Sequence, residues 1–165
     1  MFKIGDYVAH YKSGVCEVTD IGKLSISSDQ NKDYYTLKPI YDGAGTLYTP
    51  VANERNQIRE VITTERAKEL IEEMPDIATL EVTDERKREA TYKEALMRNA
   101  CDGWIAIIKT SYRRKMDRIA AGKKVINVDD RYLTSAERFL YGELAVALGI
   151  GKDEVKKYII DRIEI

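Results

Sequence analysis

The sequence predicts an α+β protein in which a small five-stranded β-barrel precedes an all-helical domain of about four to five helices. Two observations support this fold class. Residues 1–62 contain five short apolar runs rich in Val, Ile and Tyr, separated by clusters of turn residues, a pattern typical of short β-strands. After residue 62 the apolar residues recur at helical spacing instead. The chain of 165 residues is therefore expected to form two domains, 1–62 and 63–165.

Turn residues divide the first domain into its strands. The tripeptide Lys-Ser-Gly at 12–14 suits a tight hairpin, because Gly14 tolerates a positive φ. Longer turns are expected at 27–32 (SSDQNK) and 41–45 (YDGAG), whose residues adopt or mimic backbone turns. Five short strands in so few residues favour a strongly bent barrel of the SH3 or Tudor kind. The strands are expected at 6–11, 14–21, 33–40, 46–50 and 57–62.

The second domain is expected to be helical throughout. Residues 63–83 are expected to form a short amphipathic helix followed by a connector. Thr83 offers an N-cap for a second helix that runs to about Asn99. Gly122 and Gly149 are placed to end the third and fourth helices, because glycine adopts the left-handed conformation common at helix ends. The third, fourth and last helices are expected at about 102–121, 128–148 and 152–163.

The only tryptophan, Trp104, lies on the expected third helix. Ile108, Tyr112 and Met116 follow it at four-residue steps, so that the four side chains form one stripe along the helix. Such a stripe indicates the face that packs against the rest of a domain. We therefore expect Trp104 to be a core residue.

Charge is unevenly distributed along the chain, although the whole chain has a net charge of −1. Residues 63–85 carry a net charge of −6, whereas residues 86–124 carry 12 basic and 4 acidic side chains, a net charge of +8. A local excess of this size is the electrostatic footprint expected for a phosphate-rich partner such as nucleic acid. The simpler alternative is a solvated helix face, which accounts for many charge runs.

Nine basic side chains of this region are the candidates for contacts with DNA. We expect them to contact phosphates and not to read base edges, since most side-chain contacts to DNA position the protein without carrying sequence information. About half of them are expected only to be solvated. The candidates are Arg86, Lys87, Arg88, Lys109, Arg113, Arg114, Arg118, Lys123 and Lys124.

The sequence lacks the sets of residues that catalysis or metal binding require. His10 is the only histidine and falls in an expected strand, so neither a histidine-containing zinc site nor a nucleophile–histidine pair can be assembled elsewhere. Lys152 follows a glycine, but Asp153 comes next where a P-loop needs Ser or Thr. We expect a protein that is not an enzyme and that needs no cofactor and no metal.

The sequence also predicts a location. No apolar run approaches the roughly 20 residues that a membrane-spanning helix needs, and the N-terminal residues lack the apolar segment of a secretory signal. Cys16 and Cys101 show no metal-ligand spacing, and two isolated thiols are expected to be reduced and structural. These features favour the cytoplasm and no contact with a membrane.

Several stretches of the sequence, taken together, resemble one family. FKIGDYVAHYKSGVCEVTDI, YYTLKPI and LYTPVAN resemble the RNA-polymerase-interacting domain of the CarD/CdnL family of bacterial transcription regulators, a module that also occurs in the transcription-repair coupling factor. The pattern P-x-x-N at 50–53 adds support. SYRRKMDR and FLYGELAVALG are similar to the C-terminal domain of the stand-alone regulators. The resemblance covers nearly the whole chain in the same order.

The resemblance implies a protein that bridges two partners. The Tudor-like barrel would add a strand edge to the first lobe of the RNA polymerase β subunit, and the helical domain would contact promoter DNA near the upstream edge of the bubble and so modulate the stability of the open complex. On this basis the candidates for polymerase binding are Leu47, Tyr48 and Thr49. The alternative for Leu47 is simple packing inside the barrel. The protein is expected to act as a monomer.

The sequence departs from the family at one point that concerns mechanism. Many members of the family carry a tryptophan near the start of the second helix of the helical domain, where it wedges at the edge of the melted DNA. Here Asp84 and Glu85 occupy this region, and Trp104 lies on the next helix. Phosphates would repel both carboxylates. We therefore expect electrostatic contact with DNA, without a wedge by Trp104.

Two other functions are open at this point. The first is a protein–protein adaptor, whose barrel binds polymerase while the helices bind another protein; salt-sensitive affinity for DNA would argue against it. The second makes the barrel an RNA-binding module, but the barrel lacks an evident aromatic cluster flanked by basic residues. Competition by RNA would test this second function.

Overall fold

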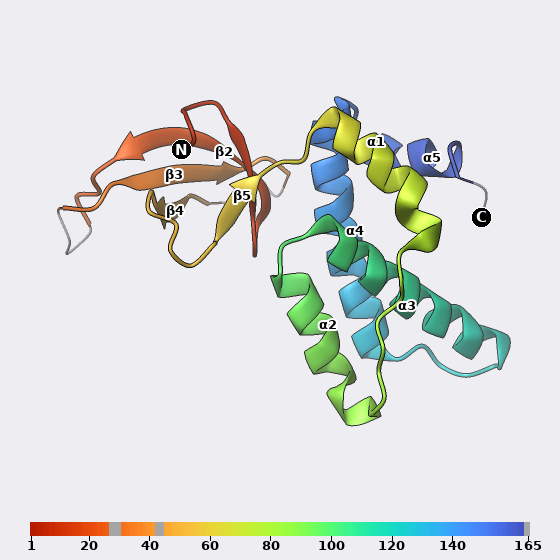
Figure 1. Cartoon of the computed structure of the whole chain (residues 1–165). Helices are drawn as coiled ribbons and strands as arrows, with labels where there is room; N and C mark the ends of the chain where they lie inside the picture. Colours follow the sequence, from red (N-terminus) through yellow and green to blue (C-terminus); the bar gives the residue numbers. More distant parts are fainter. Residues whose placement is uncertain (27–30, 42–44, 164–165) are drawn as a thin grey trace. The chain divides into compact units, whose positions relative to one another are not determined.

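The computed structural model describes residues 1–26, 31–41 and 45–163 (Figure 1). The chain divides into two compact units, Met1–Val61 and Ile62–Ile165, and each is described by itself. The turns predicted at 27–32 and 41–45 lie partly outside the described residues. Within the described part of the chain, no helix is both long enough and apolar enough to cross a membrane.

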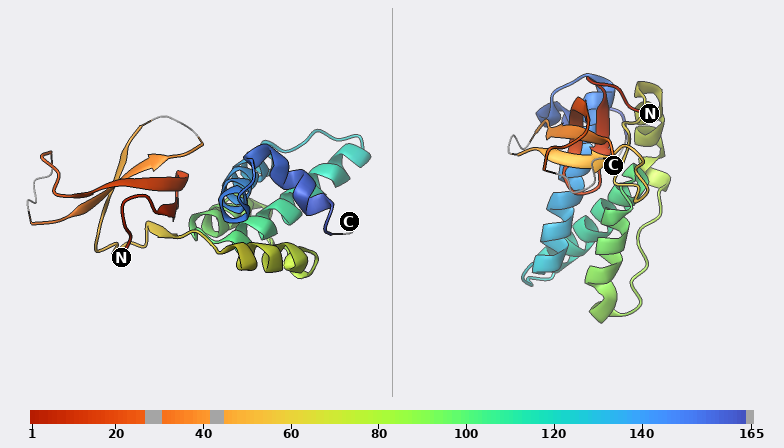
Figure 2. Two further views of the ribbon diagram at one scale, coloured as in Figure 1. Left: turned by 90° about the horizontal axis from the view of Figure 1, so that it is seen from above. Right: turned by 90° about the vertical axis from the view of Figure 1, so that its left-hand side faces the viewer.

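The N-terminal unit is a five-stranded antiparallel sheet with the order β4-β3-β2-β1-β5. The sheet curls into a half-barrel, and the curvature of its strands can be followed in the two views of Figure 2. The predicted fold class is thereby confirmed for this unit, with β4 and β5 as the two edges of the sheet. The strands are β1 (Tyr7–His10), β2 (Gly14–Gly22), β3 (Tyr34–Pro39), β4 (Leu47–Pro50) and β5 (Ile58–Glu60).

Two local features shape this sheet. Gly14 has a φ of 72° at the β1–β2 hairpin, where its predicted positive φ is confirmed. The register of β2 against β3 shifts between Val18 and Asp20, and an extra residue of this kind bends a strand and increases its twist. Bending lets one face of the sheet close over an apolar core, whose buried members are Val8, Cys16, Val18, Tyr35, Leu37 and Ile58.

The C-terminal unit consists of helices, as predicted. Its two longest helices, α3 and α4, make the most extensive contact of the unit, and α1 and α2 pack beside them (Figure 1). Short 3-10 turns precede or follow three of the helices. The elements are α1 (Thr64–Glu73), η1 (Met74–Asp76), η2 (Glu85–Lys87), α2 (Arg88–Met97), α3 (Cys101–Ala120), α4 (Asn127–Leu148), η3 (Lys152–Glu154) and α5 (Val155–Ile160).

The helix ends partly follow the prediction. Gly122 and Gly149, with φ of 71° and 68°, end α3 and α4 as expected. The predicted N-cap at Thr83 is wrong, because the Asp84 side chain accepts a hydrogen bond from the Arg86 N–H at 3.0 Å and caps η2 instead. A carboxylate is the stronger acceptor, and it also interacts favourably with the positive end of a helix. The α-helix itself begins only at Arg88.

The predicted stripe on α3 is correct only in its first half. Trp104 is 2% exposed, whereas Tyr112 and Met116 are 54% and 37% exposed. The physical reason is that two basic side chains, Arg114 and Arg118, turn toward the protein and form hydrogen bonds or ion pairs there. Tyr112 and Met116 lie on the opposite face of this half, because each four-residue step advances about 40° around a helix of 3.6 residues per turn, and they are left at the surface.

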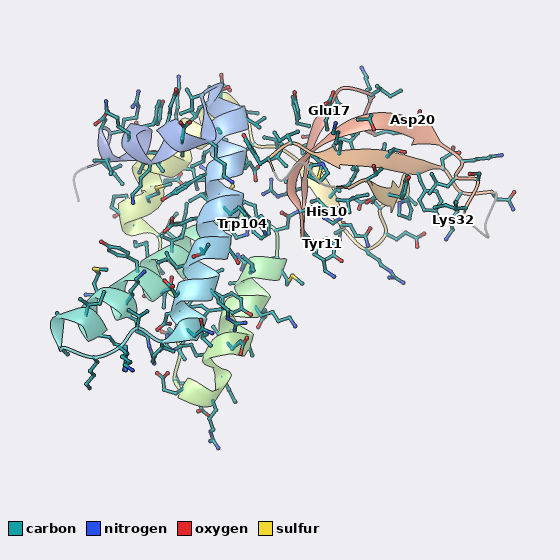
Figure 3. All side chains as sticks on the ribbon, turned by 180° about the vertical axis from the view of Figure 1, so that it is seen from behind. His10, Tyr11, Glu17, Asp20, Lys32 and Trp104 are labelled. Atoms are coloured by element: carbon teal, nitrogen blue, oxygen red, sulfur yellow. The ribbon has the colours of Figure 1, made fainter. Side chains whose placement is uncertain are left out.

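Trp104 lies in the core of the helical unit, as predicted. Its ring stands 5.6 Å from the ring of Phe139 on α4, and its indole N–H donates to the Leu96 carbonyl at 3.3 Å. Figure 3 shows the side chain close to α4. The indole therefore has both apolar contacts and a partner for its single polar group, which is the usual arrangement of a buried tryptophan.

A buried carboxylate fixes the start of the helical unit. Glu143 on α4 is fully buried and accepts hydrogen bonds from the Ile62 N–H at 3.0 Å and from the Cys101 thiol at 3.4 Å. Nearby, the Thr64 hydroxyl donates to the Ala147 carbonyl at 2.6 Å. The first residues of the unit are therefore bonded to α4.

Candidate functional site

The helical unit has a basic groove. The connector between η1 and η2 runs along α3 (Figure 1), where the Leu80 N–H donates to the Thr110 hydroxyl at 2.9 Å. Beside this contact an open groove of about 430 Å³ is lined by five cationic side chains and one acidic side chain, Asp117. The five cations are among the nine predicted DNA candidates: Arg88, Arg113, Arg114, Arg118 and Lys123.

Two arginines of the groove are held by Glu85. Arg88 donates to both carboxylate oxygens at 2.9 Å, and Arg114 donates to the same oxygens at 2.8 and 2.7 Å. Hydrogen bonds from Arg88, and then from Arg114, lower the pKa of Glu85 to about 2. The side chains of Arg88 and Arg114 are only 13% and 22% exposed. Together they form a fixed inner wall of the groove.

A buried acid on α4 supports this wall. Asp129 is fully buried, and its oxygens lie 2.7 Å from the Tyr92 hydroxyl, which donates, and 2.9 Å from Nε of Arg114. Burial, together with the hydrogen bond to Asp129, raises the pKa of Tyr92 to about 12. Side chains from α2, α3 and α4 therefore meet at one carboxylate. The sequence predicts only a helix at about 128–148 in this region.

Three cations form the outer part of the groove. Arg113 and Lys123 are exposed, and neither side chain has a hydrogen-bond or ion-pair partner among the residues that the structure describes. Arg118 is half-buried, and its Nε donates to the Lys124 carbonyl at 2.7 Å. These side chains can meet an anion without first breaking an ion pair.

The other four DNA candidates lie outside the groove. Lys109 donates through Nζ to the carbonyls of Met74 and Pro75 at 3.0 and 3.1 Å, so it completes the carbonyl ends of α1 and η1. Such a capping role for lysine is common at helix C-termini. Arg86 pairs with Asp84 at 3.3 Å, yet its side chain is 90% exposed. Lys87 and Lys124 are also exposed.

The N-terminal unit contains the second predicted site, on the edge strand β4. Tyr48 is 44% exposed, whereas Thr49 is 1% exposed. Leu47 is partly buried and packs against the core of the sheet, which agrees with the alternative that this residue packs inside the barrel. Among the described strands β4 pairs with β3 alone, which leaves its outer edge open. Tyr48 is therefore the predicted residue whose side chain reaches solvent, and its neighbours can take part through their backbone.

The turn after β4 depends on one asparagine. Asn53, the last residue of the P-x-x-N pattern, has a φ of 48°. Its amide NH₂ donates to the Ile58 carbonyl at 2.9 Å, and its amide oxygen accepts from the N–H of Gln57 at 2.9 Å and of Ile58 at 3.3 Å. Asparagine is one of the few residues that tolerate this backbone conformation. It links the end of β4 to the start of β5.

His10 has a structural role in the β1–β2 turn. Its Nδ1 accepts hydrogen bonds from the N–H groups of Lys12 and Ser13, both at 3.2 Å, and its ring lies beside that of Tyr11 (Figure 3). Burial, and then the charge of Lys12, lower the pKa of His10 from its ordinary value of 6.5. The described residues contain no group of three or more His, Cys, Asp or Glu side chains placed to hold a metal ion.

The sheet, its open edge and the turn held by Asn53 lie within the stretch of the chain that matches a known domain family. Residues 2–62 match the family model of the CarD-like/TRCF RID domain. The N-terminal unit is a CarD-like/TRCF RID domain. The RID domain supports an interaction with RNA polymerase and a role related to transcription. A search of curated proteins finds no match to the chain.

The RID match covers β1 to β5 and leaves out the helical unit. For the RID domain, the sequence pattern found the exposed Tyr48 but missed the role of Asn53, which only the left-handed tolerance of asparagine within P-x-x-N could have indicated. For the helical unit, the local charge excess led to five cations that share one groove. It could not reveal that Glu85 and Asp129 engage two of them.

Proposed function

We propose that the chain is a bacterial transcription regulator that binds the RNA polymerase β subunit through its RID domain and promoter DNA through its helical unit. The observation that carries the proposal is the RID match at residues 2–62, joined to a helical unit with a basic groove. By holding both partners, the protein would modulate the stability of the open complex. It would work as a monomer in the cytoplasm and would not act as an enzyme.

Polymerase binding would use the open edge of β4. An exposed strand edge offers N–H and C=O groups to a partner strand, so that main-chain hydrogen bonds supply affinity and side-chain pockets supply specificity. Tyr48, 44% exposed on that edge, is the side chain that can add specificity. A tyrosine is well suited, because it buries a large apolar ring and keeps one polar group.

DNA binding would rely on phosphate contacts from the accessible cations. Arg113, Arg118 and Lys123 line the groove, while Arg86, Lys87 and Lys124 extend the positive surface outside it. Lys109 and Arg114 are engaged with backbone carbonyls and with Asp129, so they support the fold of this surface. Trp104 is buried, which supports contact with DNA that does not use this residue as a wedge.

The test of DNA binding is a salt titration with the triple variant Arg113→Glu, Arg118→Glu and Lys123→Glu. If each side chain makes one phosphate contact, the slope of log K against log salt falls by roughly 2–3 units, on promoter and unrelated duplexes alike. Arg114 is left unchanged because its partner Asp129 is buried. Unchanged DNA affinity in the triple variant would contradict DNA binding by this surface.

The second candidate function is an adaptor that joins polymerase to another protein. It has one observation in its favour, because α3 exposes Tyr112, Met116 and Ile119 at helical spacing. Exposed apolar groups of this kind can form the centre of a protein interface. An adaptor would show no salt-dependent affinity for duplex DNA, and the triple variant would then leave transcription unchanged.

A further inference from the structure

The basic groove of the helical unit has a shape that suits a small ligand. It is an open groove of about 430 Å³, a volume within the range of roughly 300–1,000 Å³ typical of small-molecule sites. Cations that surround one hollow concentrate their field there and raise the local concentration of a small anion. Cations spread along a surface suit the evenly spaced phosphates of a duplex instead. The groove is therefore better matched to one compact, highly charged anion.

The inner wall of the groove is built to present guanidinium groups in fixed positions. Asp129, fully buried, pairs with Nε of Arg114, and Glu85 pairs with both Arg88 and Arg114. The second terminal nitrogen of Arg114, Nη2, has no hydrogen-bond partner among the described residues. Side chains that ion pairs already hold in place lose little freedom when a ligand binds, which increases affinity.

The outer wall supplies the charge that is free to bind. The side chains of Arg113 and Lys123 are exposed and have no partner among the described residues, and the Arg118 side chain uses only its Nε, which donates to a backbone carbonyl. Asp117 is the one acidic side chain of the lining. Arginine binds phosphate through two parallel hydrogen bonds, which gives it an advantage over a simple point charge.

We propose that this groove is a binding site for a freely diffusing anion with two or more linked phosphate groups. Such an anion offers clustered charge to the outer cations and further acceptor oxygens to Nη2 of Arg114. The proposal goes beyond the polymerase and DNA functions and does not depend on either. Because Arg113, Arg118 and Lys123 are also DNA candidates, the anion and DNA would compete for them.

The test uses calorimetric titration of the full-length protein with inorganic tripolyphosphate, without DNA or polymerase. Arg113→Glu combined with Lys123→Glu should weaken binding about tenfold or more, since each change removes a charge-assisted hydrogen bond. The matched control is Arg86→Glu combined with Lys87→Glu, which changes the net charge equally on exposed residues outside the groove. This control should change the affinity by less than about twofold. Asp117→Asn should strengthen binding.

Three results would overturn the proposal. The first is absence of tripolyphosphate binding by the unaltered protein. The second is equal weakening in the two double variants, which would show general attraction to a positive surface. The third is sulfate binding as tightly as tripolyphosphate, because linked phosphates would then have no preference. Binding of duplex DNA without binding of tripolyphosphate would contradict the anion site and leave the proposed DNA function standing. Binding of tripolyphosphate without binding of duplex DNA would contradict the DNA function and leave the anion site standing. Thermal melts of all variants confirm that they fold.

Discussion

At the scale of single residues, Trp104 shows how much one buried side chain contributes to the helical unit. It is 2% exposed, contacts the ring of Phe139 and donates its indole N–H to a backbone carbonyl. A wedge that enters a base step must project from the surface. The indole cannot project without leaving the core.

We expect Trp104→Ala to lower the stability of the helical unit by about 3–5 kcal/mol, a large part of the roughly 5–15 kcal/mol that a domain usually has. Trp104→Phe should restore most of the loss, because it refills most of the volume and keeps the aromatic contact. Thermal unfolding measures both. An alanine variant that keeps its stability but shortens the lifetime of the open complex would contradict this role.

His10 is a second residue whose environment predicts a measurable effect. Its Nδ1 accepts two backbone hydrogen bonds, so the folded state needs the neutral ring, and the pKa of His10 is lowered from 6.5. The unfolded state therefore binds a proton more readily. The stability contribution is complete above pH 6.5 and is lost as the pH falls from there toward the lower pKa of the folded state.

We expect the free energy of unfolding of the RID domain to decrease as the pH falls below about 6.5. Denaturant titrations between pH 5 and 8 measure this decrease. His10→Asn is the control, because its amide oxygen can replace Nδ1 as acceptor but does not titrate. The prediction is refuted by a pH profile that is the same in both proteins.

At the scale of elements, β4 combines an open edge with one exposed aromatic side chain. Tyr48 and Tyr7 are matched in exposure, at 44% and 46%, but Tyr7 lies on β1, which is paired on both sides. Replacing each in turn with alanine therefore distinguishes a contact at the β4 edge from a contact elsewhere on the sheet.

We expect Tyr48→Ala to weaken binding to the isolated lobe of the polymerase β subunit by about tenfold, in the range of an interface tyrosine that contributes 1–2 kcal/mol. Tyr7→Ala should bind as the unaltered protein does. Surface plasmon resonance measures both affinities. Loss of binding in the Tyr7 variant alone would show that the polymerase contacts another part of the sheet.

At the scale of the whole molecule, the RID domain has its own core and its own edge strands. A contact made mainly by backbone hydrogen bonds of one edge requires nothing from the helical unit. The two proposed functions would then be separable by truncation.

We expect residues 1–62 alone to capture the β-subunit lobe with an affinity within a few-fold of the full chain. A pull-down with the isolated domain, with the full chain as reference, makes the comparison. Circular dichroism first shows that the fragment is folded. Capture by the helical residues 63–165 and not by residues 1–62 would reverse the assignment of the two units.

The sequence predicts the elements of this molecule better than its site, for physical reasons. Strand alternation, helical spacing and glycine ends are local, and these features placed β1 to β5, α3 and α4 correctly. Whether a cationic side chain forms an ion pair or a hydrogen bond depends on groups that are distant in the sequence. Lys109 binds carbonyls more than 30 residues away, and Arg114 binds an aspartate of the next helix. No local pattern distinguishes these two cations from Arg113.

The bond between Glu143 and Ile62 has a mechanical consequence. Ile62 is the first residue of the helical unit, and its N–H is held by a buried carboxylate of α4. A pull on the chain at this end of the unit would therefore pass directly to α4, one of its two longest helices, before it reaches α1.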